Sequence, residues 1–570
     1  MRTLVRASSV APLLAALAAC TDAPAPSGAK PTPGDIDLAF ASAHAVLVDF
    51  ELDGELTSPS SAPATQRAQI AAQLTYTIGQ LNGDSSVGRM ERLEITSLVS
   101  TPNAAGTYDV MYHAKLPVAW GKPSAVPATY TVKVPRVATA AGLDAWVGTY
   151  NTTCVGFDGS GADRYSFWYY YRPATAGCVL SPTDTVSAVA TVTKSPENTV
   201  GKYPEYDKVW SDGQLRVVAM YGRNESGATA NSDPGIADYN SFVAQVRSYV
   251  RSVQPDLTKI TETPGLTNTP GAAMPQVSIA ATLPLVGSEA SARRIQVDVM
   301  LVGYRIYQDG ATFDAWYDPL TPTADIVLYA GHAGLGENVH TLMNKGVIGP
   351  GQYTIWMVNG CDTFAYVDPT LADRVSAANG GAASTLYLDT VSNAMPSYFG
   401  RTPGGSMRMI QSLMAVTAPR SYPEIFSGID PKQIVVVTGE EDNTYDKSKP
   451  AVPGVPIGVP DAGAPDAGGK DAGGGAKDAG GGATDAAAPS DAGAGASSSG
   501  SSGASSGGAS SGGASSGGGG DDAGCACTSA PGHAAGGAGS ALLAVALATS
   551  LVAARQRRRR EAAGDVHSRE

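Results

Sequence analysis

The chain has 570 residues and a formal net charge of −13, with 52 Asp and Glu against 39 Lys and Arg. This acidic balance argues against a nucleic-acid binder and against charge-driven binding to anionic lipid. Six cysteines are too few for a disulfide scaffold at this length, so a large hydrophobic core must hold the folded part together.

The first residues have the features of an export signal. Arg2 and Arg6 precede an apolar stretch at 10–19 that is too short to span a bilayer. The ending Leu-Ala-Ala-Cys20 resembles the lipobox of bacterial lipoproteins. That resemblance implies removal of residues 1–19 and acylation of the Cys20 sulfur. An ordinary signal peptide with an incidental cysteine is the alternative.

Residues 35–136 are expected to form a small α+β domain. Apolar and polar residues alternate at 46–52 as in a strand, and 66–81 has helical spacing. Pro and Gly turns separate further strands, which are expected near 93–98, 107–116 and 130–134.

The next segment, 137–200, is rich in aromatic residues. Cys154 and Cys178 can pair locally, and the disulfide would enclose the aromatic run 165–171. We expect this run to be a strand whose alternate rings fill a core. A platform on which carbohydrate stacks is the alternative.

From 205 to 446 the pattern changes to apolar strands that alternate with helices. This alternation predicts a mostly parallel sheet covered by helices on both faces. Ligands bind such sheets outside the carboxyl ends of the strands. Strands are expected at 215–221, 295–302, 326–330, 353–358, 385–391 and 433–438, and helices at 235–253, 313–318, 363–378 and 406–416.

Two residues with nucleophilic and basic chemistry follow neighbouring strands of this sheet. His332 ends one strand, and Cys361 follows the next one directly after Asn359 and Gly360. Cys361 is the one cysteine left without an expected role or disulfide partner, because roles are expected for the other five. The thiolate is the nucleophilic form of cysteine, and a neighbouring imidazole can hold its proton. Nearby backbone N–H groups can stabilise an oxyanion.

This arrangement resembles the clan CD peptidases, the caspase, legumain and gingipain group, in which the His follows one sheet strand and the Cys follows the next. The resemblance covers 215–438 by topology but, by motif, only the surroundings of His332 and Cys361. It implies a caspase-like α/β fold in which Cys361 is the nucleophile and His332 the general base and acid. The backbone N–H groups near Gly334 and Gly360, together with that of Cys361, would form the oxyanion site.

The chain also departs from the family pattern. Ala333 follows His332 where the family usually has Gly, and Asp362 would oppose ionisation of the neighbouring thiol if it pointed inward. Related enzymes set their specificity with a charged pocket residue. The candidates for the substrate pocket are Asp389, Ser392 and Asn393, for which capping or turn roles are the alternative.

Two other classes of function remain open. One is a zinc site, for which the candidate ligands are His332, His340, Cys361, Asp362 and Glu337. His332 and His340 are not at i,i+3 or i,i+4 spacing, and no metal or other cofactor is expected.

The other is a non-enzyme. A degenerate peptidase-like domain would then serve binding or envelope structure, and Cys361 would be a small buried hydrophobic residue.

Residues 447–523 are mostly Gly, Ala, Ser, Asp and Pro. Large apolar side chains are nearly absent from this segment, so it is expected to be a disordered linker.

The tail at 524–560 combines a cysteine motif, an apolar stretch and a basic cluster. Cys525 and Cys527 precede the uncharged stretch 534–554, which is long enough to cross a bilayer, and arginines follow. This order resembles the MYXO-CTERM sorting signal of myxobacterial surface proteins and implies processing near Cys525. A plain transmembrane anchor is the alternative.

The two ends together predict an exported protein. We expect it to be lipid-anchored at the outer membrane or cell surface of a Gram-negative bacterium. Its expected partners are the membrane and a peptide or protein substrate, and no nucleic acid.

Overall fold

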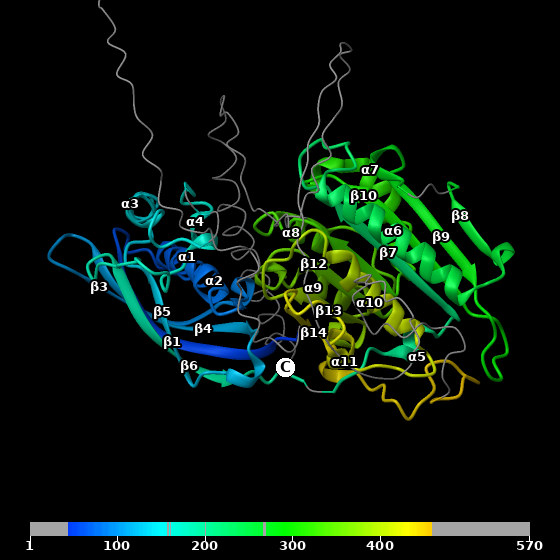
Figure 1. The fold of residues 1–570 in the computed structure, drawn as a ribbon. Coiled ribbons are helices and arrows are strands. Elements are labelled where there is room, and N and C mark those ends of the chain that lie inside the picture. Colours follow the sequence, from blue (N-terminus) through cyan, green and yellow to red (C-terminus); the bar gives the residue numbers. More distant parts are fainter. Residues whose placement is uncertain (1–43, 157–158, 160, 200, 266–268, 459–570) are drawn as a thin grey trace, which may run out of the picture. The chain divides into compact units, whose positions relative to one another are not determined.

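The computed structural model describes residues 44–156, 159, 161–199, 201–265 and 269–458, and Figure 1 shows how they fold. All of them fall in one compact unit, Phe40–Glu570. The expected signal peptide with Cys20, most of the linker, and the tail with Cys525 and Cys527 lie outside the described residues. Within the described ranges, no helix has the length and apolar character needed to cross a membrane.

The N-terminal part, blue to cyan in Figure 1, is built on a six-stranded antiparallel sheet. The strand order is β2-β4-β1-β6-β5, and β3 also pairs with β4. A strand forms where the alternation at 46–52 predicted one, and alternate residues are buried from Phe50 to Ser58. The residues from Leu47 to Phe50 are all buried, so this end of β1 is covered on both faces. Phe50 pairs with Leu116 of β4. The strands are β1 (Val46–Ser58), β2 (Ser86–Gly88), β3 (Glu94–Pro102), β4 (Tyr108–Trp120), β5 (Thr129–Pro135) and β6 (Thr185–Lys194).

Two helices replace the single one expected at 66–81. They are α1 (Pro63–Leu74) and α2 (Tyr76–Asn82), which meet at Thr75. Ile70 and Leu74 of α1 pack into the same buried cluster as Phe50 of β1, so the helix covers the apolar face of the sheet.

The segment 137–200 completes this sheet, because β6 pairs with both β1 and β5. The expected disulfide between Cys154 and Cys178 is confirmed. The strand expected at 165–171 is wrong: the run contains the short helix α4 (Phe167–Tyr170) instead. Its rings do fill a core, in which Phe167 packs edge-on against Tyr76 of α2. The remaining helix of the segment is α3 (Ala140–Tyr150).

The second part, green to yellow in Figure 1, contains an eight-stranded sheet of order β14-β13-β12-β11-β7-β10-β9-β8. Its five inner strands, β10, β7, β11, β12 and β13, are mutually parallel, which confirms the mostly parallel sheet. The outer strands β14, β9 and β8 are antiparallel. The strands are β7 (Gln214–Gly222), β8 (Ile260–Thr263), β9 (Gln276–Thr282), β10 (Arg294–Val302), β11 (Ile326–Ala330), β12 (Thr354–Asn359), β13 (Leu388–Asn393) and β14 (Val435–Thr438).

Helices cover both faces of this sheet, as expected from strands that are apolar throughout. One buried cluster joins the sheet to α6 and α10, and the other joins it to α7, α8 and α9. The helix expected at 363–378 is interrupted, because Pro369 separates a 3₁₀ turn, Thr363–Tyr366, from α9. The helices are α5 (Tyr206–Val209), α6 (Pro234–Val253), α7 (Gly310–Tyr317), α8 (Glu337–Asn344), α9 (Thr370–Ala378), α10 (Thr402–Met414) and α11 (Tyr422–Phe426).

The order of the inner strands contains a reversal. In chain order, β7 is the first of the five, β10 lies on one side of it, and β11, β12 and β13 follow on the other side. Parallel sheets bind ligands outside the carboxyl ends of the strands at such a reversal. This rule points to the edge where β7, β11 and β12 end.

Candidate active site

The structure brings His332 and Cys361 to the same edge of the sheet. Ala330 at the end of β11 pairs with Asn359 at the end of β12, and His332 and Cys361 each lie two residues beyond that pair. Because neighbouring strands run about 4.8 Å apart, the two residues leave the sheet side by side.

Glycine is required where the two strand ends approach each other. A Cβ atom on Gly360 would lie 2.6 Å from the carbonyl oxygen of Gly331. Gly334, which follows the histidine, has a φ of 63°, a conformation that side chains other than glycine rarely adopt. These glycines let the backbone turn closely around both residues.

A backbone carbonyl orients the ring of His332. Its Nε2 lies 3.0 Å from the carbonyl oxygen of Asn224, in the segment that follows β7. Because a carbonyl only accepts hydrogen bonds, Nε2 carries the proton, and Nδ1 keeps its lone pair. Nδ1 is buried and has no hydrogen-bond partner among the described residues. Burial lowers the pKa of His332, so the neutral ring prevails near neutral pH.

The carbonyl of Asn224 is itself held in place. Asp233, the N-cap of α6, accepts hydrogen bonds from the backbone N–H groups of Asn224, Glu225 and Ile236, each at 3.0 Å. One carboxylate therefore fixes both the start of α6 and the loop that orients the histidine.

Cys361 is fully buried, and His332 is 2% exposed. The thiol donates a hydrogen bond to the carbonyl oxygen of Ser397 at 3.5 Å. Cys361 also belongs to an apolar cluster that includes Ala333 and Phe399. The structure therefore describes a closed arrangement in which neither side chain is open to solvent.

Asp362 is bound by the N-terminal part of the molecule. It has a φ of 52°, and its Oδ1 accepts a hydrogen bond from Nδ2 of Asn82, the last residue of α2, at 3.0 Å. Burial raises the pKa of Asp362 to about 7 from its ordinary value of 3.8. Hydrogen bonds from Tyr169 and Asn82, and then the positive charge of Arg172, partly offset this effect. Near neutral pH the group is therefore about half protonated.

This carboxyl group makes stability depend on pH. Because its pKa is higher in the folded state than in the unfolded state, the folded protein binds the proton more tightly. Its contribution to stability is complete below about pH 4 and is lost as the pH rises through about 7. We expect Asp362→Asn, which keeps the acceptor for Asn82, to raise the free energy of unfolding at pH 8 by about 2 kcal/mol.

Urea unfolding at several pH values between 4 and 8 measures this effect. Asp207→Asn is the matched control, because Asp207 is exposed. If the Asp362→Asn protein lost stability between pH 4 and pH 8 as steeply as the wild type, the buried carboxyl would not be the titrating group.

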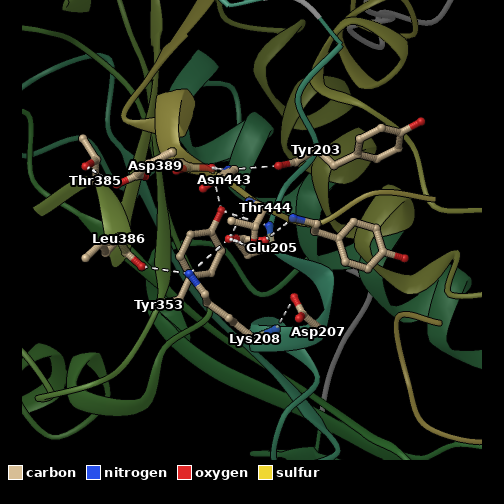
Figure 2. A network of polar contacts seen from close by, with 12 residues as sticks. Tyr203, Glu205, Asp207, Lys208, Tyr353, Thr385, Leu386, Asp389, Asn443 and Thr444 are labelled. Atoms are coloured by element: carbon tan, nitrogen blue, oxygen red, sulfur yellow. Dashed lines mark hydrogen bonds and ion pairs between the residues drawn. The ribbon is translucent and has the colours of Figure 1, made fainter. Parts of the chain in front are cut away.

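The structure does not bring Asp389 to this site. Asp389 is the second residue of β13 and pairs with Ile355, near the start of β12, so it lies toward the opposite end of the strands from Cys361. Its Oδ2 accepts hydrogen bonds from the hydroxyl of Tyr353 at 2.5 Å and from Nδ2 of Asn443 at 2.8 Å (Figure 2). The hydroxyl of Tyr422 donates to the same oxygen at 2.5 Å. Asp389 is thus part of a buried polar network, and this position contradicts a role as the acid of a substrate pocket at Cys361.

Ser392 and Asn393 do lie at the carboxyl end of β13, on the same edge as Cys361. Ser392 pairs with Val358, and the backbone N–H of Asn393 donates to Oγ1 of Thr363 at 2.8 Å. Both side chains are buried, and Oγ of Ser392 and Nδ2 of Asn393 have no hydrogen-bond partner among the described residues. These polar atoms are available to a ligand only if the site opens.

The other potential zinc ligands are not grouped around the pair. His340 on α8 forms an ion pair with Glu91 at 3.3 Å, and Asp362 binds Asn82. Across the described ranges, no three His, Cys, Asp or Glu side chains are arranged so that they could hold a metal ion.

Sequence reasoning missed three participants: Asn224, Ser397 and Phe399. The first two act through backbone carbonyls, which every residue type possesses, so their identity carries no signal. The position of Asn224 did carry a sequence signal, because this residue follows a strand expected to end at the same edge as His332.

Comparison with protein-family models, curated proteins and solved structures finds no match to this chain.

Proposed function

We propose that residues 205–446 form a caspase-like domain that hydrolyses peptide bonds with Cys361 as nucleophile and His332 as general base and acid. The observation that carries the proposal is the tautomer of the His332 imidazole. Its proton is held on Nε2 by the Asn224 carbonyl, and the unpartnered Nδ1 lone pair lies at the strand end beside the one that bears the thiol. The proposal is also supported by the parallel pairing of β11 and β12, whose adjacent ends precede His332 and Cys361.

The chemistry follows from these positions. Nδ1 of His332 takes the thiol proton, and the sulfur attacks the substrate carbonyl carbon to form a tetrahedral intermediate. When the C–N bond breaks, the imidazolium returns the proton to the leaving amine. Water then hydrolyses the thioester, again with His332 as base, and releases the acid and the free thiol. Backbone N–H groups at Gly334, Gly360 and Cys361 are the donors proposed for the oxyanion.

The proposed location is outside the cytoplasm. The lipobox-like Cys20 and the tail around Cys525 and Cys527 would tether the protein to a membrane at the cell surface, where it meets peptide or protein substrates. The confirmed disulfide between Cys154 and Cys178 supports export, because such bonds persist in oxidising compartments.

A non-catalytic surface protein is the second candidate. The complete burial of Cys361 favours it, because free cysteines are commonly inert core residues. Such a protein would use the peptidase-like domain for binding or envelope structure.

Alkylation of the purified full-length chain separates the two candidates. If His332 activates the thiol, His332→Ala slows iodoacetamide labelling of Cys361 at pH 7 at least about tenfold. His340→Ala is the matched control and leaves the rate unchanged. Mass spectrometry of the peptide that contains Cys361 distinguishes it from the other cysteines. Equal labelling rates in the wild type and His332→Ala would overturn the proposed pair.

A further inference from the structure

The segment between β13 and α10, residues 394–401, runs over both members of the proposed pair. Near its start, Met395 accepts a hydrogen bond from the backbone N–H of Asp362 at 3.3 Å. Two residues later, the Ser397 carbonyl accepts the Cys361 thiol at 3.5 Å. The ring of Phe399 then stands edge-on to the ring of His332, with centroids 5.2 Å apart.

The same segment is fastened on both sides. The hydroxyl of Ser397 donates to Oδ1 of Asn359 at 2.7 Å, which ties the segment to the end of β12. On the other side, Asp238 of α6 accepts the backbone N–H of Gly400 at 2.8 Å and the hydroxyl of Thr402 at 2.6 Å. Asp238 is 3% exposed, so both of these hydrogen bonds are shielded from water.

A substrate has to occupy the space that this segment fills. A thiolate attacks a peptide carbonyl at the Cys361 sulfur, and at present the chain's own Ser397 carbonyl faces that sulfur. The histidine that must exchange protons with the substrate is covered by Phe399. A substrate cannot reach both residues while residues 397–399 stay where they are.

We propose that residues 394–401 are a built-in lid that occupies the substrate position over Cys361 and His332, with Asp238 as the latch that keeps it closed. This inference rests on the proposed function for the identity of the site. It adds that a substrate cannot reach Cys361 and His332 while the lid is closed. The lid makes the protein latent: peptides are cut only after the hydrogen bonds to Asp238 are broken or displaced.

The test compares access to the thiol in latch variants of the full-length protein. Asp238→Ala removes both acceptors and is expected to raise the rate of iodoacetamide labelling of Cys361 at least about tenfold. Thr402→Val removes one of the two hydrogen bonds and gives a smaller rise. Gln245→Ala, on an exposed position of the same helix, is the matched control and leaves the rate unchanged.

Limited trypsin digestion shows whether the opening is local. An open lid exposes the bond after Arg401, so Asp238→Ala is expected to be cut there first, with the rest of the chain still folded by circular dichroism. Phe399→Ala weakens the lid in a second way, because it removes the ring that packs the lid against His332. The hydrogen bonds to Asp238 and the ring of Tyr304 against His332 stay in place, so a smaller rise in the labelling rate of Cys361 is expected.

The outcomes separate the lid from the peptidase proposal. If neither Asp238→Ala nor Phe399→Ala labels faster than wild type while both are folded, the lid is refuted. Faster labelling that His332→Ala does not slow, without hydrolysis of any peptide, supports the lid and refutes the proposed Cys–His chemistry.

Discussion

In the Asp238→Ala background, Cys361→Ser is expected to reduce peptide hydrolysis at least about a thousandfold. A serine hydroxyl in place of the thiol is a far poorer nucleophile beside this histidine. His332→Ala is expected to cause a loss of the same order, since the thiol then has no group to take its proton. The double variant should be no worse than either single one, because residues that act as a unit are not additive.

The assay measures kcat/KM on a library of fluorogenic peptides, with the wild type and Asp238→Ala compared in parallel. Including Asp238→Ala guards against a lid that hides activity in the wild type. Residual hydrolysis that is equal in Cys361→Ser and wild type would assign the activity to a contaminant or to another site. Folded protein that cuts no peptide in either background would favour the non-catalytic surface protein.

Glu205→Ala is expected to lower the free energy of unfolding by about 3 kcal/mol, because it strips several buried donors of their acceptor. The Glu205 carboxylate is 1% exposed and accepts the backbone N–H of Thr444 at 2.9 Å (Figure 2). It also accepts the backbone N–H of Tyr445 at 2.7 Å. It also forms an ion pair with Lys208 at 3.1 Å. Burial alone would raise the pKa of Glu205, but these bonds outweigh burial and hold it below its ordinary value.

Urea unfolding at pH 7 measures the loss. Glu205→Gln keeps one acceptor oxygen and is expected to lie between the wild type and Glu205→Ala. Asp207→Ala removes an exposed carboxylate two residues away and serves as the control. A change below about 1 kcal/mol in Glu205→Ala would mean that water replaces the lost acceptor.

The parallel sheet could be predicted because its strands are apolar throughout and alternate with amphipathic helices. That pattern also fixed the positions of His332 and Cys361, since a residue just beyond a parallel strand must lie at the carboxyl edge. Asp389 was expected at the carboxyl end of its strand because the bounds of that strand were predicted a few residues too early. The expected strand 385–391 includes residues of a 3₁₀ turn, Ser384–Leu386, and the real strand begins at Leu388.

Other features left no local trace in the sequence. The aromatic run at 165–171 reads equally well as a strand or as a short helix, and only its packing against Tyr76 and Trp146 selects the helix. The covering of Cys361 by residues 394–401 joins segments more than thirty positions apart through a backbone carbonyl. No spacing rule anticipates such a contact.

The contacts between the two sheets determine what happens when the chain is cut between them. The backbone N–H of Ala45, just before β1, donates to Val435 of β14 at 2.8 Å, and Ala45, Ile78 and Tyr169 share one apolar cluster with Cys361. If a protease cut the chain between β6 and α5, these contacts would therefore hold the two fragments together. The part that contains His332 and Cys361 would expose apolar surface if it were prepared alone, and we expect it to precipitate.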